Sequence, residues 1–384
     1  MKKLVSLGLA AAMALTSLTG CGSKAEGSST ELVIGGSGPL TGPAATYGNA
    51  VKNGTQLAID EINKAGGVNG IKLKLNFQDD EADPEKAVNA YNTTLDAGAK
   101  VFVGTTTSGA CEAIADKTNQ DGMFLISPSA SSVDSVKNDN QFRVCFNDPN
   151  QGSASADYIS SNKLASKVAI IYKSSDVYSS GVYEKFVAKA KEDGLEVVAE
   201  EAVTADSNTD FSAQLQKVKD SKADLLFLPL YYEEAALILQ QADKAGIKTK
   251  VFGCDGLDGL TTQLKDNLEL TEGVMLLTPF AADAKDEKTQ EFVKAYKAAY
   301  NNEVPIQFAA DAYDAVYTVK AAMEKAGIKD ASISINDMCD KLKAAMTEIT
   351  VDGVTGSMTW DASGEPTKDP KAMVIQSGEY KAME

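Results

Sequence analysis

Short apolar runs alternate with longer segments of helical pattern along nearly the whole chain, and this alternation limits the possible folds more than any other feature. The expected strands cover residues 32–34, 71–77, 101–103, 123–126, 142–144, 168–172, 196–198, 225–228 and 251–252. Helices are expected at 47–64, from Asp83-Pro84 onward, and at 181–193, 211–219, 233–245, 289–300 and 309–326. This pattern predicts parallel β-sheets covered by helices on both faces.

The alternation falls into two series that are separated near Asp148-Pro149. A chain of 384 residues suits two domains, since domains commonly have about 100–200 residues. We therefore predict an α/β protein with two doubly wound parallel-sheet lobes. Ligands of open α/β sheets bind beyond the carboxyl ends of the strands, so two facing lobes predict a binding cleft between them.

The start of the chain has the pattern of a secretory signal. Lys2 and Lys3 precede an apolar run at 4–18, and small residues lead to Cys21. This pattern resembles the bacterial lipobox, in which the cysteine receives a diacylglyceryl group and becomes the first residue of the mature chain. We predict a signal peptide at 1–20 and a Gly/Ser-rich, lipid-anchored tether at 21–30, which places the remainder on the extracytoplasmic side of the membrane. The alternative is a buried helix that ends in an incidental cysteine.

Composition excludes several classes of function. The formal net charge of −17 argues against nucleic-acid binding and against an electrostatic membrane-docking face, so the lipid is the only expected membrane contact. The chain has no histidine, which excludes a Ser-His-Asp or Cys-His hydrolase. After Cys21, four cysteines show no metal-binding spacing: Cys111, Cys145, Cys254 and Cys339. A disulfide among them stays open, and buried free thiols are favoured.

Neither a metal ion nor a cofactor is expected. The acidic stretch at 79–83 lacks the alternating ligands and the glycine of an EF-hand, and it favours a helix start. Gly36, Gly38 and Gly42 follow the first strand, but they depart from the GxGxxG spacing of a dinucleotide loop, and Pro39 interrupts them. A dinucleotide-dependent enzyme remains as the catalytic alternative.

An ordered set of motifs resembles the leucine/isoleucine/valine-binding proteins, the type I solute-binding components of branched-chain amino-acid importers. The set comprises residues 37–48, 61–70, 78–84, 103–108, 126–129, 252–256 and 358–361, and the resemblance runs from about residue 31 to the C-terminus. It implies the type I periplasmic-binding-protein fold, with a hinge of three crossovers near 147–150, 278–279 and 355–361. Lobe 1 would then comprise 31–148 and 279–357, and lobe 2 would comprise 149–278 and 358–384.

The resemblance also implies which side chains hold an amino-acid ligand. Ser108, Ser129 and Ser131 would hold the headgroup through hydroxyls and main-chain groups beside a helix N-terminus, and Asp255 would bind the ammonium. Interpreted from the residues alone, the serines would only cap helices and Asp255 would be a turn aspartate before a glycine. Four aromatic residues would form the side-chain pocket: Tyr47, Tyr178, Tyr231 and Phe308.

Three departures from the family pattern concern the ligand or the first lobe. A glutamate is common in the family where this chain has Asp255. The family's first-lobe disulfide would need cysteines at Ala82 and Thr107, and neither is present. Asp311 lies close to Phe308 on the late helix. If Asp311 faces the cleft, the pocket suits a cationic or amide-bearing ligand; otherwise its side chain points to solvent.

The implied function is capture of a free amino acid by closure of the lobes, without chemistry on the ligand. A monomeric lipoprotein would then deliver the amino acid to an ABC permease with its ATPase subunits. Branched-chain or related aliphatic amino acids are the expected ligands. The sequence leaves open a binder of another amino acid, a short amide or urea, and a sensor that reports to a signalling partner.

Overall fold

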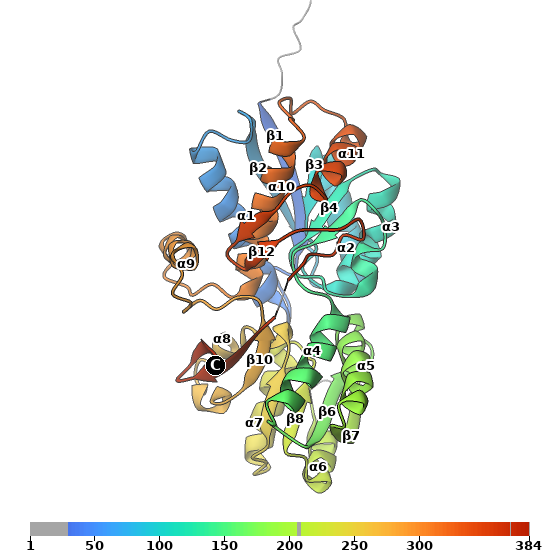
Figure 1. Ribbon diagram of the computed structural model, residues 1–384, viewed down its shortest axis with the longest axis vertical. Helices are drawn as coiled ribbons and strands as arrows, with labels where there is room; N and C mark the ends of the chain where they lie inside the picture. Colours follow the sequence, from blue (N-terminus) through green and yellow to red (C-terminus); the bar gives the residue numbers. More distant parts are fainter. Residues whose placement is uncertain (1–29, 206–208, 369, 384) are drawn as a thin grey trace, which may run out of the picture.

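The computed structural model describes residues 30–205, 209–368 and 370–383. Cys21, the predicted signal peptide and residues 21–29 of the predicted tether lie outside the described residues. The described chain forms two α/β lobes that follow one another along the long axis of the molecule (Figure 1). Within these ranges, no helix has the length and apolar character that crossing a membrane requires.

The sheet of the first lobe is fully parallel, with strand order β2-β1-β3-β4-β5. Its strands are β1 (Glu31–Gly38), β2 (Lys72–Asp79), β3 (Ala99–Val103), β4 (Phe124–Ser127) and β5 (Gln141–Arg143). Helices α1 (Ala45–Lys64), α10 (Gln307–Lys325) and α11 (Ile335–Met346) pack on one face, and α2 (Pro84–Asp96) and α3 (Ser108–Gln120) pack on the other. Burial on both faces explains why the inner strands β3 and β4 are mostly apolar, whereas the edge strand β2 alternates lysine with leucine where it begins.

The acidic stretch before α2 starts that helix, as the sequence predicts. Asp83 is the N-cap, and its carboxylate accepts hydrogen bonds from the N–H groups of Glu85 and Lys86, both at 2.9 Å. Pro84 follows at the first helical position, where its missing N–H costs nothing. The interpretation as a helix start is confirmed.

The sheet of the second lobe has strand order β14-β13-β10-β9-β8-β6-β7. Its parallel strands are β6 (Lys167–Lys173), β7 (Glu196–Val203), β8 (Leu225–Leu228), β9 (Lys250–Gly253) and β10 (Met275–Thr278). An antiparallel hairpin of β13 (Lys371–Gln376) and β14 (Glu379–Ala382) extends it beyond β10. Helices α4 (Asp148–Ser161) and α5 (Val177–Glu192) pack on one face, and α6 (Ser212–Ser221) and α7 (Tyr232–Lys244) pack on the other.

Helix α4 is an element that the sequence does not predict, because its residues are mostly small and polar. Its formation depends on close packing against α5. A Cβ atom built on Gly152 would lie 2.4 Å from the carbonyl oxygen of Val182 and 2.8 Å from the nitrogen of Phe186. Glycine therefore permits an approach of the two backbones that no other residue allows.

Three chain segments connect the lobes. The first leads from β5 into α4, and the second follows β10 toward α9 (Glu287–Ala299) and α10. The third follows the small hairpin of β11 (Val351–Gly353) and β12 (Gly356–Met358). Beyond β12 the chain stays on the first lobe, since the indole N–H of Trp360 donates to the carbonyl of Arg143 at 2.7 Å and Lys368 bonds to Asp311. It joins the second sheet at β13.

The four cysteines of the described residues, Cys111, Cys145, Cys254 and Cys339, are free and buried. This confirms the favoured interpretation of the sequence. Burial raises the pKa of each thiol, so the folded chain keeps them in the unreactive protonated form.

Candidate ligand-binding site

A narrow cavity of about 10 Å³ lies between the two lobes. It is lined by Tyr47, Thr106, Thr107, Ser108, Ser129, Ser131, Tyr178, Tyr231, Asp255, Gly256 and Phe308. All eight residues that the sequence singles out therefore meet at one place. Strand ends explain the convergence, because most of these residues follow the carboxyl end of a parallel strand. Sequence reasoning missed Thr106, Thr107 and Gly256, and the only signal for them was their position beside Ser108 and Asp255.

Serine and threonine residues form the first-lobe wall of the cavity. The hydroxyl oxygen of Ser108 accepts hydrogen bonds from the N–H groups of Ser131 and Ser132, both at 3.1 Å. Its own proton is therefore left to donate. The hydroxyl of Ser129 donates to the carbonyl oxygen of Thr106 at 2.7 Å, so its lone pairs remain available to a donor.

The alternative in which these serines cap helices does not hold for α3. The N-cap of α3 is Thr107, and no side chain caps this helix. The first N–H groups of α3 consequently lack a side-chain acceptor beside the cavity, and Ser108 is the first residue of the helix. Free N–H groups and a hydroxyl donor at a helix N-terminus suit a carboxylate.

Asp255 forms the anionic part of the second-lobe wall. Its side chain is only 3% exposed, and one carboxylate oxygen accepts from the amide of Gln151 at 3.0 Å. Burial raises the pKa of Asp255 to about 7, which hydrogen bonds from Tyr178 and Gln151 partly offset and the nearby charge of Asp311 increases. A cation beside Asp255 would relieve this cost and ionise the carboxyl group.

Three cations with little exposed surface are bound to carboxylates other than Asp255. Arg143 pairs with Glu365 at 3.2 Å, Lys173 with Glu234 at 2.8 Å, and Lys368 with Asp311 at 3.0 Å. None of these cations is committed to Asp255. Among the described residues Asp255 thus forms no ion pair, and the ammonium group of a ligand would supply one.

Aromatic rings from both lobes enclose the rest of the cavity. Tyr47 of α1 stacks on Phe308 of α10 with ring centroids 4.1 Å apart, and Tyr178 stacks on Tyr231 at 5.2 Å. The two pairs meet edge to face, because the centroids of Tyr47 and Tyr231 are 5.5 Å apart. This arrangement gives a largely apolar pocket with few rotatable bonds to restrict.

The hydroxyl of Tyr47 connects the lobes directly. It donates to the carbonyl oxygen of Gly256 at 2.5 Å and accepts from the N–H of Tyr232 at 3.0 Å. Gly256 is required here, since a Cβ atom on it would lie 2.5 Å from the carbonyl oxygen of Leu230 and 2.8 Å from the Tyr178 hydroxyl. The structure is therefore that of closed lobes.

Asp311, whose direction the sequence leaves open, does not line the cavity. It is fully buried, and Lys368 donates to it at 3.0 Å while also donating to the carbonyl of Val144 and the hydroxyl of Thr355. Asp314, one turn along, accepts from the N–H and hydroxyl groups of Thr355. Asp311 therefore belongs to a buried ionic cluster at the hinge, and neither alternative proposed for it from the sequence is correct.

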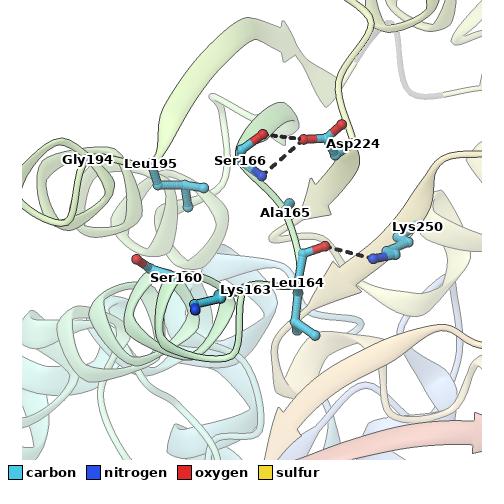
Figure 2. Close-up of a pocket in the computed structure, with 9 residues that line it drawn as sticks. All are labelled: Ser160, Lys163, Leu164, Ala165, Ser166, Gly194, Leu195, Asp224 and Lys250. Atoms are coloured by element: carbon cyan, nitrogen blue, oxygen red, sulfur yellow. Dashed lines mark hydrogen bonds between the residues drawn. The ribbon is translucent and has the colours of Figure 1, made fainter.

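A larger and more open depression of about 590 Å³ lies at the opposite end of the second lobe, and Figure 2 shows the residues that line it. It borders the amino ends of β6, β8 and β9, which is not where α/β sheets bind ligands. Its polar groups bond to one another: Asp224 accepts from the N–H and hydroxyl of Ser166, and Lys250 donates to the carbonyl of Leu164 at 2.8 Å. The interlobe cavity remains the candidate site.

The structure gives no support to the dinucleotide-loop alternative. Gly36 and Gly38 lie within β1, and Cβ atoms on them would contact the carbonyl oxygen of Val103 at 2.6 Å and the hydroxyl of Thr106 at 2.2 Å. These glycines permit close packing of strands and leave no space for a phosphate. In the parts of the chain that the structure describes, no group of three or more Cys, Asp or Glu side chains could hold a metal ion.

Comparison with known proteins agrees with this architecture. Residues 31–378 match the model of a family described as periplasmic binding protein. A Leu/Ile/Val-binding protein homologue of Brucella melitensis is 31% identical over 87% of this chain and 88% of its own length. A leucine-, isoleucine-, valine-, threonine- and alanine-binding protein of Pseudomonas aeruginosa is 29% identical over 85% of each chain.

Solved structures give the same result. The branched-chain amino-acid transporter substrate-binding protein LivJ of Streptococcus pneumoniae, solved with isoleucine, superposes with a TM-score of 0.83 at 31% identity over 92% of this chain and 98% of that chain. The leucine-binding protein LivK of Thermotoga maritima reaches a TM-score of 0.81 at 25% identity over 92% and 98%. The two-lobe fold predicted from the sequence is confirmed, and the chain belongs to the periplasmic binding protein family, whose matched members are solute-binding proteins.

Proposed function

We propose that this protein captures a free α-amino acid, branched-chain or related aliphatic, between its lobes. The observation that carries the proposal is the polarity of the two walls. One wall presents a hydroxyl donor at a helix N-terminus, and the other presents Asp255 without a cation of its own. An α-amino acid supplies the matching carboxylate and ammonium on one carbon atom. Relatives that are named for leucine, isoleucine and valine binding support this choice of ligand.

Binding and closure are coupled in this proposal. The headgroup's carboxylate binds Ser108 and the start of α3, with Ser129 and Ser131 beside it, and its ammonium draws Asp255 of the other lobe onto it. Contacts to both walls exist only when the lobes are closed, so the ligand stabilises the closed state by that difference. The aromatic rings then exclude water from the aliphatic side chain.

The remaining parts of the proposal concern the setting of the protein. We infer that Cys21 carries a lipid, which holds a monomeric protein on the extracytoplasmic face of the membrane, and that an ABC permease with its ATPase subunits receives the ligand. The ligand is released unchanged, without catalysis. We place the lobe boundaries at 148/149 and 278/279 as predicted, and the third boundary beyond Lys368, because Trp360 and Lys368 bond to first-lobe residues.

Isothermal titration calorimetry with the twenty amino acids, acetamide and urea tests the proposal. Leucine, isoleucine or valine should bind, and Asp255→Ala should weaken binding by about 3–5 kcal/mol, the cost of removing one partner of a buried ion pair. Asp243→Ala is the matched control, because Asp243 forms an exposed pair with Lys248 and should leave affinity unchanged. Binding of an amino acid that survives Asp255→Ala intact would refute the proposed site.

Transport itself needs a separate measurement. Vesicles that contain the ABC permease and ATPase subunits proposed as its partners should accumulate labelled amino acid only when this protein is present. Ligand binding without stimulated uptake would instead support a sensor that reports to a signalling partner.

A further inference from the structure

Two cavity-lining hydroxyl groups have no hydrogen-bond partner. The hydroxyls of Thr106 and Thr107 are buried and find neither donor nor acceptor among the described residues. The side chains are 1% and 6% exposed, so solvent does not serve them in the closed lobes. Native proteins seldom leave a buried hydroxyl unpaired, because removing it from water without a replacement bond costs free energy.

Local structure does not satisfy these groups although it could. Thr107 is the N-cap of α3 with an extended backbone, the geometry in which a threonine hydroxyl usually accepts from the first turn, yet it makes no capping bond. The neighbouring Thr105 behaves ordinarily, since its hydroxyl donates to the carbonyl oxygen of Thr107 at 3.1 Å. The buried hydroxyl of Thr55 also lacks a partner, but among the unpaired hydroxyls of the described residues only those of Thr106 and Thr107 belong to residues that line the cavity.

Thr106 lies where the headgroup wall meets the aromatic pocket. Its carbonyl oxygen accepts from Ser129, which faces the proposed headgroup. Its hydroxyl packs against Gly38 at the end of β1, since a Cβ atom on Gly38 would lie 2.2 Å from it, and the chain continues from there to Tyr47. A group on the first carbons of a ligand side chain would reach this corner of the cavity.

The hydroxyls of Tyr47 and Tyr178, which also line the pocket, already have partners. The Tyr47 hydroxyl is bonded to Gly256 and Tyr232, and the Tyr178 hydroxyl accepts from the N–H of Gly256 at 3.1 Å. Ser108 and Asp255 match the two charges of an amino-acid headgroup. The hydroxyls of Thr106 and Thr107 thus represent hydrogen-bonding capacity that an aliphatic side chain cannot use.

We propose that Thr106 and Thr107 make the site selective for a β-hydroxy amino acid, threonine before valine. This inference rests on the proposed function and narrows its ligand class. A hydroxyl both donates and accepts, so the ligand's hydroxyl pairs with one threonine as donor and with the other as acceptor. Valine has the same shape, but its methyl group leaves both hydroxyls unpaired, and a site built for a hydroxyl discriminates against such an analogue.

The test measures the dissociation constants of L-threonine and L-valine by calorimetry for the full mature chain and for the isosteric variant Thr106→Val/Thr107→Val. The wild type should bind threonine roughly 5- to 100-fold more tightly than valine, the range expected for one unpaired buried group. The double variant should equalise or reverse the preference. Thr105→Val is the matched control, because it loses a hydroxyl that bonds within the protein and lies outside the cavity lining.

The outcomes separate this inference from the function on which it rests. If the wild type prefers valine, or if the double variant keeps the wild-type ratio while its circular dichroism and unfolding midpoint show a folded protein, the inference is wrong. Asp255-dependent binding of leucine would in that case leave the proposed function standing. If no amino acid binds and Asp255→Ala changes nothing, both are wrong.

Discussion

Replacing Tyr47 by phenylalanine isolates the contribution of the interlobe hydrogen bonds to ligand affinity. The change removes one oxygen atom and keeps the ring that stacks on Phe308 at 4.1 Å. Two hydrogen bonds are lost, to the carbonyl of Gly256 and from the N–H of Tyr232. Both cross from the first lobe to the second, so they exist only when the lobes are closed.

The expected magnitude follows from these two bonds. Each contributes a net of about 0.5–1.5 kcal/mol, so Tyr47→Phe should weaken closure by about 1–3 kcal/mol. Since 1.4 kcal/mol is a factor of ten, the dissociation constant should rise roughly 5- to 150-fold. The open form exposes the hydroxyl to water, so the free energy of unfolding of the open protein should change little.

Calorimetry gives the affinity, and small-angle X-ray scattering gives the fraction of closed molecules with and without ligand. Tyr300→Phe serves as the control, because the Tyr300 hydroxyl donates to the carbonyl of Asn53 at 2.8 Å, away from the cavity. An affinity of Tyr47→Phe within about twofold of wild type, with Tyr300→Phe behaving likewise, would show that these bonds do not stabilise the closed state.

Further predictions concern buried charge. Asp148 is 1% exposed, and neither of its carboxyl oxygens has a hydrogen-bond partner among the described residues. Burial raises the pKa of Asp148 well above the usual value of about 3.9. The folded state therefore keeps a proton that the unfolded chain loses, so stability should fall as the pH rises above about 4. Asp148→Asn should flatten this dependence and raise the urea midpoint at pH 8; an unchanged slope between pH 5 and 8 would contradict the reasoning. Lys368→Met should lower the free energy of unfolding by about 3–5 kcal/mol, because it leaves Asp311 buried without its cation. Adding Asp311→Asn should recover part of that loss, and a double variant no more stable than the single one would refute the pairing.

The sequence predicts the two lobes well because most of their strands and helices have a local sequence pattern that indicates them. The strand at 225–228 is a continuous apolar run and occurs as β8, and Asp83-Pro84 starts α2. The sequence does not predict helix α4, because this helix depends on the packing of Gly152 against α5. That contact joins two separate segments of the chain, so no local pattern indicates it. The sequence also fails to predict the hairpin of β13 and β14, because β13 pairs with β10, a strand from a distant part of the chain, and β14 pairs with β13.

The candidate site likewise has features that the sequence reveals and features that only the structure shows. Its eight predicted residues could be found because each matches a position of the family and most follow a strand end, and the carboxyl ends of parallel strands converge. Their roles in binding stay a prediction. The partner of Asp311 could not be found, because Lys368 lies 57 positions away along the chain. The unpaired hydroxyls of Thr106 and Thr107 depend on side-chain geometry that sequence spacing does not contain.

The buried thiol of Cys254 can report local opening of the protein without an added label. The sulfur lies 3.4 Å from the Ser155 hydroxyl and directly precedes Asp255, behind the second-lobe wall of the cavity. A thiol reagent can modify it only after that wall loosens, so the rate of modification measures the free energy of local opening without any engineered label. Cys339, buried in the first lobe far along the chain, supplies the internal reference against which that rate can be normalised.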